Sequence, residues 1–524
     1  MNELTESDRE KLSGPVYVLL MAALLLVALG LRVYRLGVDE MWLDETLSAV
    51  AAMGSPGDIL GGVYSPKSPP LYYLLLWCWV RVFGISEIAV RGLSVLSGVA
   101  LVGCVGACGT KLFSRRAGIT AAAFAAFAPL GINYSQEARS YMLLAIFALG
   151  YLYFTLRLAD GFSAGRVAGF VLTGCGLSLT HAYGFVLLPL PNIIFLAKPA
   201  RAAYVRLMLA ELPVAACALC MWMLMESRGE VRMALWLKYT WDAMGPLGSA
   251  YSSLQSLGVG GAYPKLVFRL WQPPAAYINV PAVILVVSVA VYALARKPED
   301  GAPASRGLAR YGVAAAIFFP LFAVLALSIA WKPVYLAGRT EIIAAPAFWL
   351  LIGAGLARLK PKTLVLAGAV LFFFASYNLI HFYERDAFGA RRAVATHIAA
   401  ETGPPDPVIC GGGSCVPLKY YLTLHGEPRE LVWFPSLEKL NRYSYDPDYV
   451  AATAPGLEEE ARVIASMLAK RIKPGAMVLM VGGGKRFDTV NEWLFVAMMR
   501  RFDLVKITNR ENGLPVYHFR RKDG

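Results

Sequence analysis

Apolar segments that approach the length of a bilayer span recur from Pro15 to about Ile380, and no other feature restricts the possible fold as strongly. A helix needs about 20 predominantly apolar residues to cross a membrane. Eleven segments are predicted to cross, near residues 15–33, 90–110, 117–133, 141–157, 167–181, 183–197, 207–225, 277–295, 311–330, 340–357 and 363–380. We therefore expect a mostly α, polytopic membrane protein with about eleven transmembrane helices.

Composition and charge agree with this prediction. The chain is 57% hydrophobic and only 16% charged, whereas soluble domains carry about 25% charged residues. Basic clusters lie between alternate pairs of apolar segments, at 111–116, 157–166, 198–206, 296–310 and 358–362. With eleven spans they share one face, which is the cytoplasmic one. The net charge of +14 therefore reflects topology, and without a basic domain we expect no nucleic-acid partner.

Two segments near the N-terminus need separate treatment. Residues 1–14 are acidic and lack the basic start of a cleavable signal peptide, so the first span is expected to remain as an anchor. Arg32 and Arg35 lie at the far end of that span and roughly balance Arg9 and Lys11. The segment Pro69–Phe83 is apolar but short and is interrupted by a basic residue. We therefore predict that it lies in the membrane interface without crossing.

These segments divide the chain into three parts. Residues 1–14 form a cytoplasmic tail, and 15–380 form a transmembrane domain with outer loops 34–89 and 226–276. Residues 381–524 are predicted to form a small α/β domain outside the membrane. Its expected elements are strands 406–409 and 476–481, helices 457–472 and 488–502, and a hairpin of 504–508 with 516–520 across Asn512-Gly513.

Cysteines and glycine runs add little to this division. Six of the eight cysteines lie in or beside apolar runs and are interpreted as small core hydrophobes. Cys410 and Cys415 flank a glycine run in the polar C-terminal part, and whether they pair is left open. The run Gly482–Lys485 lacks the spacing of a phosphate-binding P-loop and is excluded as one.

Polar residues at the outer ends of the predicted spans are the candidate functional residues. Ionisable groups at membrane depth are energetically expensive and therefore functional candidates by default, although each one alone is as well explained by an interfacial anchor or a structural ion pair. The set consists of Asp44, Glu45, Lys67, Glu137, Arg139, Tyr141, His181, Tyr183, Arg339 and Glu341.

We assign expected roles by side-chain chemistry. Asp44 is predicted to cap a helix over residues 45–53 and to act as a general base, as carboxylates do in sugar transfer. Glu137 is the second catalytic candidate. The remaining candidates are expected to contact phosphate or sugar, with Arg339 favoured for phosphate because its guanidinium binds two oxygens at once; they are Glu45, Lys67, Arg139, Tyr141, His181, Tyr183 and Arg339.

The order of several short motifs resembles the C-type glycosyltransferases (GT-C). They are the Asp44-Glu45 pair in the first outer loop, the segment PPLYY ending in Phe83-Gly84, IAVRGLSVLS at 88–97 and YSQEARSYML at 134–143. Within that superfamily the chain is similar to bacterial relatives of protein O-mannosyltransferases and of the lipid A aminoarabinose transferase. The similarity covers residues 15–200 well and the remainder by layout.

This resemblance implies a polyprenyl-phosphate sugar donor, an inverting mechanism and an active site on the outer face, with Asp44 matching the catalytic acidic residue. Some relatives use a divalent cation such as Mg²⁺ or Mn²⁺, for which Asp44 and Glu137 are the possible ligands here. The chain departs from the family where Ser68 replaces the His that often precedes the Pro-Pro pair. It also lacks the Trp-Trp-Asp motif of oligosaccharyltransferases.

Because of these departures, the lipid, glycan or protein acceptor is not carried over from the family. The expected location is the inner membrane, with the active site on its periplasmic face.

Two other functions fit the same residues. A transporter of lipid-linked sugars is disfavoured because no repeat-related halves occur. A non-catalytic envelope assembly factor would tolerate the loss of Asp44.

Overall fold

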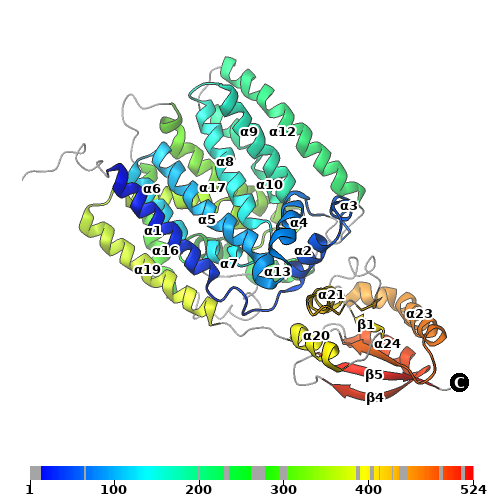
Figure 1. Ribbon diagram of the computed structural model, residues 1–524. Coiled ribbons are helices and arrows are strands. Elements are labelled where there is room, and N and C mark those ends of the chain that lie inside the picture. Colours follow the sequence, from blue (N-terminus) through cyan, green and yellow to red (C-terminus); the bar gives the residue numbers. More distant parts are fainter. Residues whose placement is uncertain are drawn as a thin grey trace, which may run out of the picture.

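The computed structural model describes residues 13–63, 67–197, 201–228, 235–260, 278–295, 304–384, 390–401, 406–411, 414–427, 429–435, 447–482, 488–508 and 514–522. A helical part extends from the N-terminus to Tyr383, and a smaller unit with a sheet lies beside one end of it (Figure 1). The expected hairpin turn at Asn512-Gly513 and most of the second half of the loop 226–276 lie outside the described residues.

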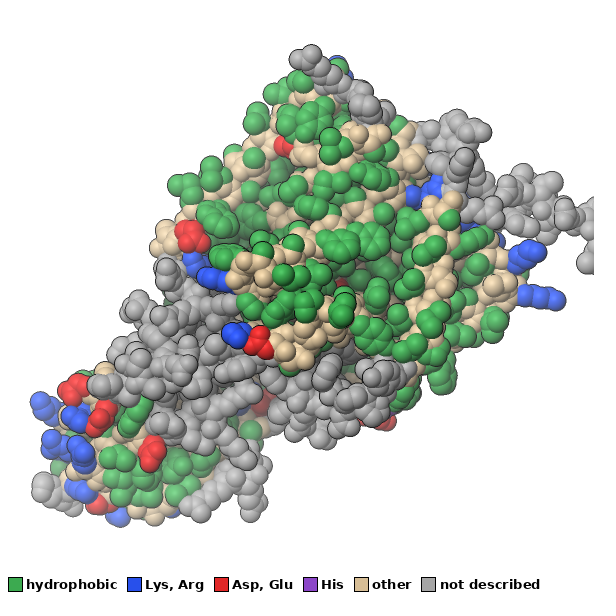
Figure 2. All heavy atoms as spheres, turned by 180° about the vertical axis from the view of Figure 1, so that it is seen from behind, with side chains coloured by type: hydrophobic (Ala, Val, Ile, Leu, Met, Phe, Trp, Pro, Cys, Tyr) green, Lys and Arg blue, Asp and Glu red, His purple; other side chains and the backbone are tan. Residues whose placement is uncertain are grey.

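Six helices are long and apolar enough to cross a membrane: α1 (Gly14–Val33), α5 (Glu87–Leu112), α8 (Tyr141–Leu158), α12 (Arg201–Ser227), α17 (Ala304–Ala330) and α19 (Pro361–Tyr383). Shorter apolar helices pack among them: α9 (Ala164–Thr180), α10 (Tyr183–Leu187), α11 (Leu190–Leu196), α16 (Val280–Ala295) and α18 (Ala345–Leu356). Large hydrophobic side chains cover the outside, as Figure 2 shows for one face. The protein is therefore a polytopic membrane protein, and the number of eleven spans stays a prediction.

The segment predicted as one span at 117–133 is two helices, α6 (Arg115–Phe127) and α7 (Pro129–Ser135), bent by 58° at the break between them. Pro129 begins α7 and has no N–H to continue the ladder. The buried guanidinium of Arg32 donates to the carbonyls of Ala125 and Ala126 and to the Ser135 hydroxyl. Arg32 therefore supports the broken span from inside the protein, and it is not a marker of topology.

The outer loops contain further helices. They are α2 (Leu43–Met53), α3 (Pro56–Gly61), α4 (Leu71–Phe83) and α13 (Leu235–Leu257), followed by a 3-10 turn, η2 (Thr340–Ile343), just before α18. Helix α4 is the segment for which an interfacial position was predicted. It has 13 residues and packs against α2 and α5. The segment 331–344 between α17 and α18 carries Arg339 back towards α2.

The C-terminal unit is built on a five-stranded sheet in the order β2-β1-β3-β5-β4. Its strands are β1 (Val408–Gly411), β2 (Leu431–Phe434), β3 (Met477–Val481), β4 (Phe502–Thr508) and β5 (Val516–Arg521). Its helices are α20 (Ala390–Glu401), α21 (Cys415–Leu424), α23 (Pro447–Arg471) and α24 (Asp488–Met499). Strands β4 and β5 pair antiparallel, as the predicted hairpin requires. The prediction missed β2 and the helices α20 and α21, and it began α23 ten residues late.

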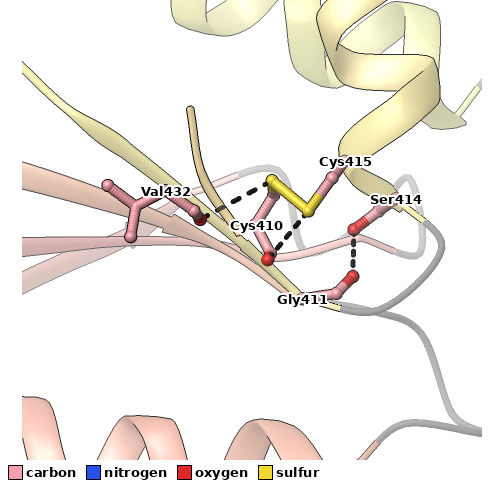
Figure 3. Close-up of a disulfide and its surroundings, with 5 residues drawn as sticks. All are labelled: Cys410, Gly411, Ser414, Cys415 and Val432. Carbon is pink, nitrogen blue, oxygen red and sulfur yellow. Dashed lines mark hydrogen bonds between the residues drawn. A yellow bond between two sulfur atoms is a disulfide. The ribbon is translucent and has the colours of Figure 1, made fainter. Parts of the chain in front are cut away.

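Alternation along the strands gives the sheet two apolar faces, because successive side chains point to opposite sides. Cys410 and Leu479 belong to a cluster shared with α20, α21 and α2, whereas Ile409 and Met480 pack with α23 and α24. Cys410 and Cys415 form a disulfide between the end of β1 and the start of α21 (Figure 3). The sequence left open whether these two cysteines pair, and the structure pairs them.

The C-terminal unit contacts the helical part through α20 and α21. The Tyr421 hydroxyl accepts from the backbone N–H of Met41 at 2.7 Å. The carboxylate of Glu40 accepts from the first amides of α20 and from the Arg391 guanidinium at 3.1 Å. These bonds attach the C-terminal unit to residues 40–41, only three positions before Asp44.

Candidate active site

Helix α2 begins within the sequence Trp-Leu-Asp-Glu at residues 42–45. Its N-cap is Trp42, in extended conformation, and the Glu45 carboxylate accepts from the Trp42 amide at 3.4 Å. The prediction that Asp44 is the cap is therefore wrong. Asp44 lies in the first turn of the helix, where a carboxylate interacts favourably with the helix dipole.

Glu45 is fully buried and forms an ion pair with Arg91 of α5. The two carboxylate oxygens accept from Arg91 at 2.8 and 2.9 Å, and Oε1 also accepts from the backbone amide of Ala138 at 3.0 Å. Arg91 further donates to the carbonyls of Leu36 and Asp39. These contacts join α2, α5 and the segment 136–140, so the geometry assigns Glu45 a structural role. Its expected contact with substrate finds no support in this arrangement.

The hydrogen bond from the Ala138 amide to Glu45 holds the next residue, Arg139, beside Asp44. One guanidinium nitrogen of Arg139 lies 3.8 Å from a carboxylate oxygen of Asp44, and another donates to the Tyr73 hydroxyl at 3.2 Å. The Asp44 side chain is 28% exposed, compared with 0% for Glu45. Asp44 is therefore the accessible carboxylate of the pair, and the nearby guanidinium is available to neutralise a phosphate.

A second guanidinium comes from the segment 331–344. The turn at Gly338 has a positive φ of 82° and accepts a hydrogen bond from Tyr134 at 2.5 Å. Arg339 follows, and the centre of its guanidinium lies 5.5 Å from the ring of Tyr141 and 5.8 Å from that of Trp42. Both distances lie within the range of cation–π contacts. Arg139 lies 5.9 Å from the same Tyr141 ring, so two cations flank one aromatic residue.

His181 and Tyr183 support this arrangement at the end of α9. The His181 ring lies 5.4 Å from Tyr141 and 4.9 Å from Tyr183, and its Nδ1 accepts from the Tyr183 amide at 3.1 Å. The Tyr183 hydroxyl donates to the carbonyl of Val334 at 3.3 Å. Tyr183 therefore anchors the segment that carries Arg339.

Lys67 lies away from this cluster, whereas Glu137 lies beside it. Lys67 donates to the carbonyl of Met225 and pairs with Glu226 at 3.4 Å, at the end of α12. Among the described residues, none of its contacts reaches Asp44 or either guanidinium. Glu137 is nearly buried and interacts electrostatically with Arg339, as Asp44 does.

The structure therefore brings together most of the predicted set. Asp44, Arg139, Tyr141, His181, Tyr183 and Arg339 form one cluster, with Glu137 beside it. Sequence reasoning missed Trp42, Tyr73 and Tyr134 as members, although all three lie within or beside the motifs that were singled out. Within the described part of the chain, no group of three or more His, Cys, Asp or Glu residues gathers that could hold a metal. The divalent cation for which Asp44 and Glu137 are the possible ligands stays a prediction.

Comparison with known proteins agrees with the fold and the motifs. Residues 67–225 match the family of dolichyl-phosphate-mannose-protein mannosyltransferases. No curated protein matches the sequence. The structure of ArnT from Cupriavidus metallidurans bound to undecaprenyl phosphate superimposes with a TM-score of 0.58 at 14% identity, over 97% of this chain and 98% of ArnT. Its apo state gives a TM-score of 0.59 at 14% identity, over 96% of this chain and 97% of ArnT.

A third similar structure is the oligosaccharyltransferase of Archaeoglobus fulgidus in complex with Zn and sulfate. Its TM-score is 0.50 at 13% identity, over 96% of this chain and 73% of that protein. The chain therefore carries the pattern of the dolichyl-phosphate-mannose-protein mannosyltransferases over residues 67–225, and its fold is similar to that of ArnT along almost its whole length.

Proposed function

We propose that the protein transfers a sugar from a polyprenyl-phosphate donor to an acceptor at the outer face of the inner membrane, with inversion at the anomeric carbon. The observation that carries this proposal is the meeting of one accessible carboxylate and two guanidinium groups around Tyr141. A phosphate needs cations that are held in place, and an acceptor hydroxyl needs a proton acceptor.

The reaction follows from these groups. The acceptor oxygen attacks the anomeric carbon while the bond from that carbon to the phosphate oxygen breaks. The phosphate leaves with the bonding electrons, and Arg139 and Arg339 stabilise its charge. Asp44 takes the acceptor proton. When the donor binds, before this proton transfer, Arg139 exchanges part of its contact with Asp44 for one with the donor phosphate, which frees the carboxylate to act as the base.

The ArnT structure and the matching family support a lipid donor. The ArnT structure contains undecaprenyl phosphate, and the matching family is described by dolichyl-phosphate-mannose. The disulfide between Cys410 and Cys415 supports an outer location of the C-terminal unit, because disulfides persist in oxidising compartments. The sugar and the acceptor are outside this proposal, and Glu137 is the candidate to assist Asp44.

The test is turnover of a purified enzyme with undecaprenyl-phosphate sugars, using the extracted envelope as the source of acceptor. Asp44→Asn keeps the size of the side chain and removes the base, so we expect the rate to fall by about 10²–10⁴ with an unchanged melting temperature. Asp58→Asn, in the capping box of α3, is the control for loss of an outer-face carboxylate. Wild-type turnover by a folded Asp44→Asn protein would refute the assignment of Asp44, and Glu137→Gln would then be tested.

A further inference from the structure

The C-terminal unit and helix α2 share one apolar core. Met41, just before α2, and Ala49 within it are buried in the same cluster as Val416 and Tyr420 of α21, and α21 lies beside α2 (Figure 1). Parts of a chain are expected to move relative to one another unless the interface between them is large and hydrophobic. The shared core therefore holds the C-terminal unit against the helix that carries Asp44.

Tyr421 of α21 makes a polar contact within this core. Its side chain is fully buried, and its hydroxyl accepts a hydrogen bond from the backbone amide of Met41 at 2.7 Å while it donates one to the carboxylate of Glu87. One hydroxyl therefore bonds to two segments of the helical part at once. Because Met41 precedes Trp42, the N-cap of α2, the first of these bonds fixes the backbone directly before the first turn of that helix.

Glu87 connects the same hydroxyl to the ion pair of Arg91 with Glu45. Glu87 lies in the first turn of α5, and its second carboxylate oxygen accepts from Arg392 of α20 at 2.6 Å. Arg91 follows one turn later on the same face of α5, and it interacts electrostatically with both Glu87 and Tyr421. The C-terminal unit therefore reaches α2 by a second route, through Arg91 to Glu45.

The two routes end on either side of Asp44. Met41 lies shortly before it in the sequence, and Glu45 is the next residue. The carboxylate of Asp44 lies 3.8 Å from the Arg139 guanidinium, which is longer than a hydrogen bond. The backbone on its two sides therefore does most to define where this carboxylate lies. A general base must lie within hydrogen-bond reach of the proton that it takes, so small movements of this backbone change its ability to act.

We propose that Tyr421 and Glu87 are positioning residues for Asp44, which makes the docked C-terminal unit a working part of the active site. Without the Tyr421 hydroxyl, the amide of Met41 is left buried without its acceptor, which is costly. The segment before α2 then shifts towards another acceptor and moves the first turn of the helix. This inference rests on the proposed function, because it takes Asp44 as the base.

The first test is the kinetics of Tyr421→Phe, which removes the hydroxyl and keeps the apolar ring. We expect kcat to fall about tenfold or more, because a misplacement of about 1 Å can lower a rate by about 10². The KM for donor should change little, since Arg339 is held by the separate bonds of Tyr134 and Tyr183 to the segment 331–344. Steady-state kinetics with an undecaprenyl-phosphate sugar measure both constants, and a purely structural defect would not divide them in this way.

The matched control is Tyr420→Phe. The Tyr420 hydroxyl donates to the carbonyl of Ile85 at 2.8 Å, so this variant also loses one bond between the C-terminal unit and the helical part, but it leaves Met41 and Glu87 bonded. Its kcat should stay near that of the wild type. An equal loss of kcat in the two variants, or no loss in Tyr421→Phe, would overturn the proposal. If Tyr421→Phe does not fold, Glu87→Gln, which weakens the same contact, is compared with the same control.

A second measurement follows residue 44 without sugar transfer. In the Asp44→Cys protein, alkylation of this site by an impermeant maleimide is followed on its own peptide by mass spectrometry. Adding Tyr421→Phe should raise the alkylation rate severalfold, because the first turn of α2 is released, whereas adding Tyr420→Phe should not. If the rate rises in this way but the wild type transfers no sugar, the positioning role stands and the proposed function fails. If the wild type transfers sugar while Tyr421→Phe changes neither kcat nor the alkylation rate, the proposed function stands and the positioning role fails.

Discussion

The neighbouring carboxylates Asp44 and Glu45 have opposite surroundings because successive residues of a helix point about 100° apart. Glu45 points inward to Arg91, while Asp44 remains partly exposed beside Arg139. Removing one partner of a buried ion pair leaves the other charge uncompensated. At the residue scale, the two side chains therefore separate into one that maintains structure and one that is positioned for chemistry.

We expect Glu45→Gln to destabilise the protein by about 3–5 kcal/mol, because the Arg91 guanidinium stays buried without its carboxylate. Thermal melting in detergent, compared with Asp44→Asn, measures this difference. If the two variants melt at the same temperature, the ion pair of Glu45 with Arg91 contributes little to stability, and the structural role given to Glu45 is wrong.

Arg339 is predicted to bind donor phosphate through its two-pronged guanidinium. Arg339→Lys keeps the charge but presents a single point donor, so the KM for donor should rise while kcat changes less. Lys67→Ala is the comparison, because Lys67 pairs with Glu226 at the end of α12. An unchanged donor KM for Arg339→Lys, together with a raised one for Lys67→Ala, would transfer the phosphate contact to Lys67.

At the scale of elements, the site depends on breaks in helices. The break between α6 and α7 and the turn between α9 and α10 both bring polar residues, at 133–141 and 181–183, to the cluster around Tyr141. Arg32 donates hydrogen bonds to the carbonyls of Ala125 and Ala126, which the break between α6 and α7 leaves without helical partners. These bonds explain why the Arg32 guanidinium is buried there. Irregular backbone is tolerated at membrane depth where the protein itself satisfies it.

The turn between α9 and α10 needs a glycine at position 184. A Cβ there would lie 2.2 Å from the backbone oxygen of Leu177, so the two segments must separate to accept it. We expect Gly184→Ala to cost about 1–3 kcal/mol and to lower activity by moving His181 and Tyr183. Gly165→Ala in α9, where nothing lies within 4 Å, should be neutral or stabilising. Melting curves of the two variants check this, and similar curves would contradict it.

At the scale of the whole molecule, topology decides which compartment the cluster faces. The basic clusters predict a cytoplasmic N-terminus and an outer position for 381–524. Cysteines introduced at Asp58 and Asp448 should be labelled by an impermeant reagent in intact cells, whereas one at Arg115 should require permeabilised cells. The reverse pattern would invert the topology and place Asp44 in the cytoplasm.

The attachment of the C-terminal unit is predicted to depend on pH through Glu40. Burial raises the pKa of the Glu40 carboxyl, against the lowering effect of Arg391. The folded state then holds the proton at pH values where the unfolded chain has lost it, so stability falls as pH rises through the usual glutamate range and levels off above the folded pKa. The Glu40→Gln variant has no carboxyl that titrates at this position, so it does not lose stability in this way as the pH rises. Its melting temperature relative to wild type should therefore increase with pH, and a constant difference would refute the shift.

The sequence by itself determined the membrane class, the approximate positions of the helices and the residue types of the site. Apolar length and basic clusters are local properties that the bilayer selects directly. The sequence also predicted strands at 476–481, 504–508 and 516–520, which correspond to β3, β4 and β5, because buried strands and hairpins leave a local pattern. The resemblance to GT-C enzymes came from ordered motifs, again without any knowledge of contacts.

Only the tertiary structure decided which of these residues act together. The sequence placed Asp44 and Glu45 side by side, but Arg91, 46 positions away, separates their roles. The sequence favoured Arg339 over Lys67 for phosphate only by side-chain chemistry, and the structure adds that Lys67 pairs with Glu226 while Arg339 lies beside Tyr141. The bend at Ala128 and the contact of Tyr421 with Met41 depend on long-range packing. No local propensity encodes such packing, because the partners meet only when the helices assemble.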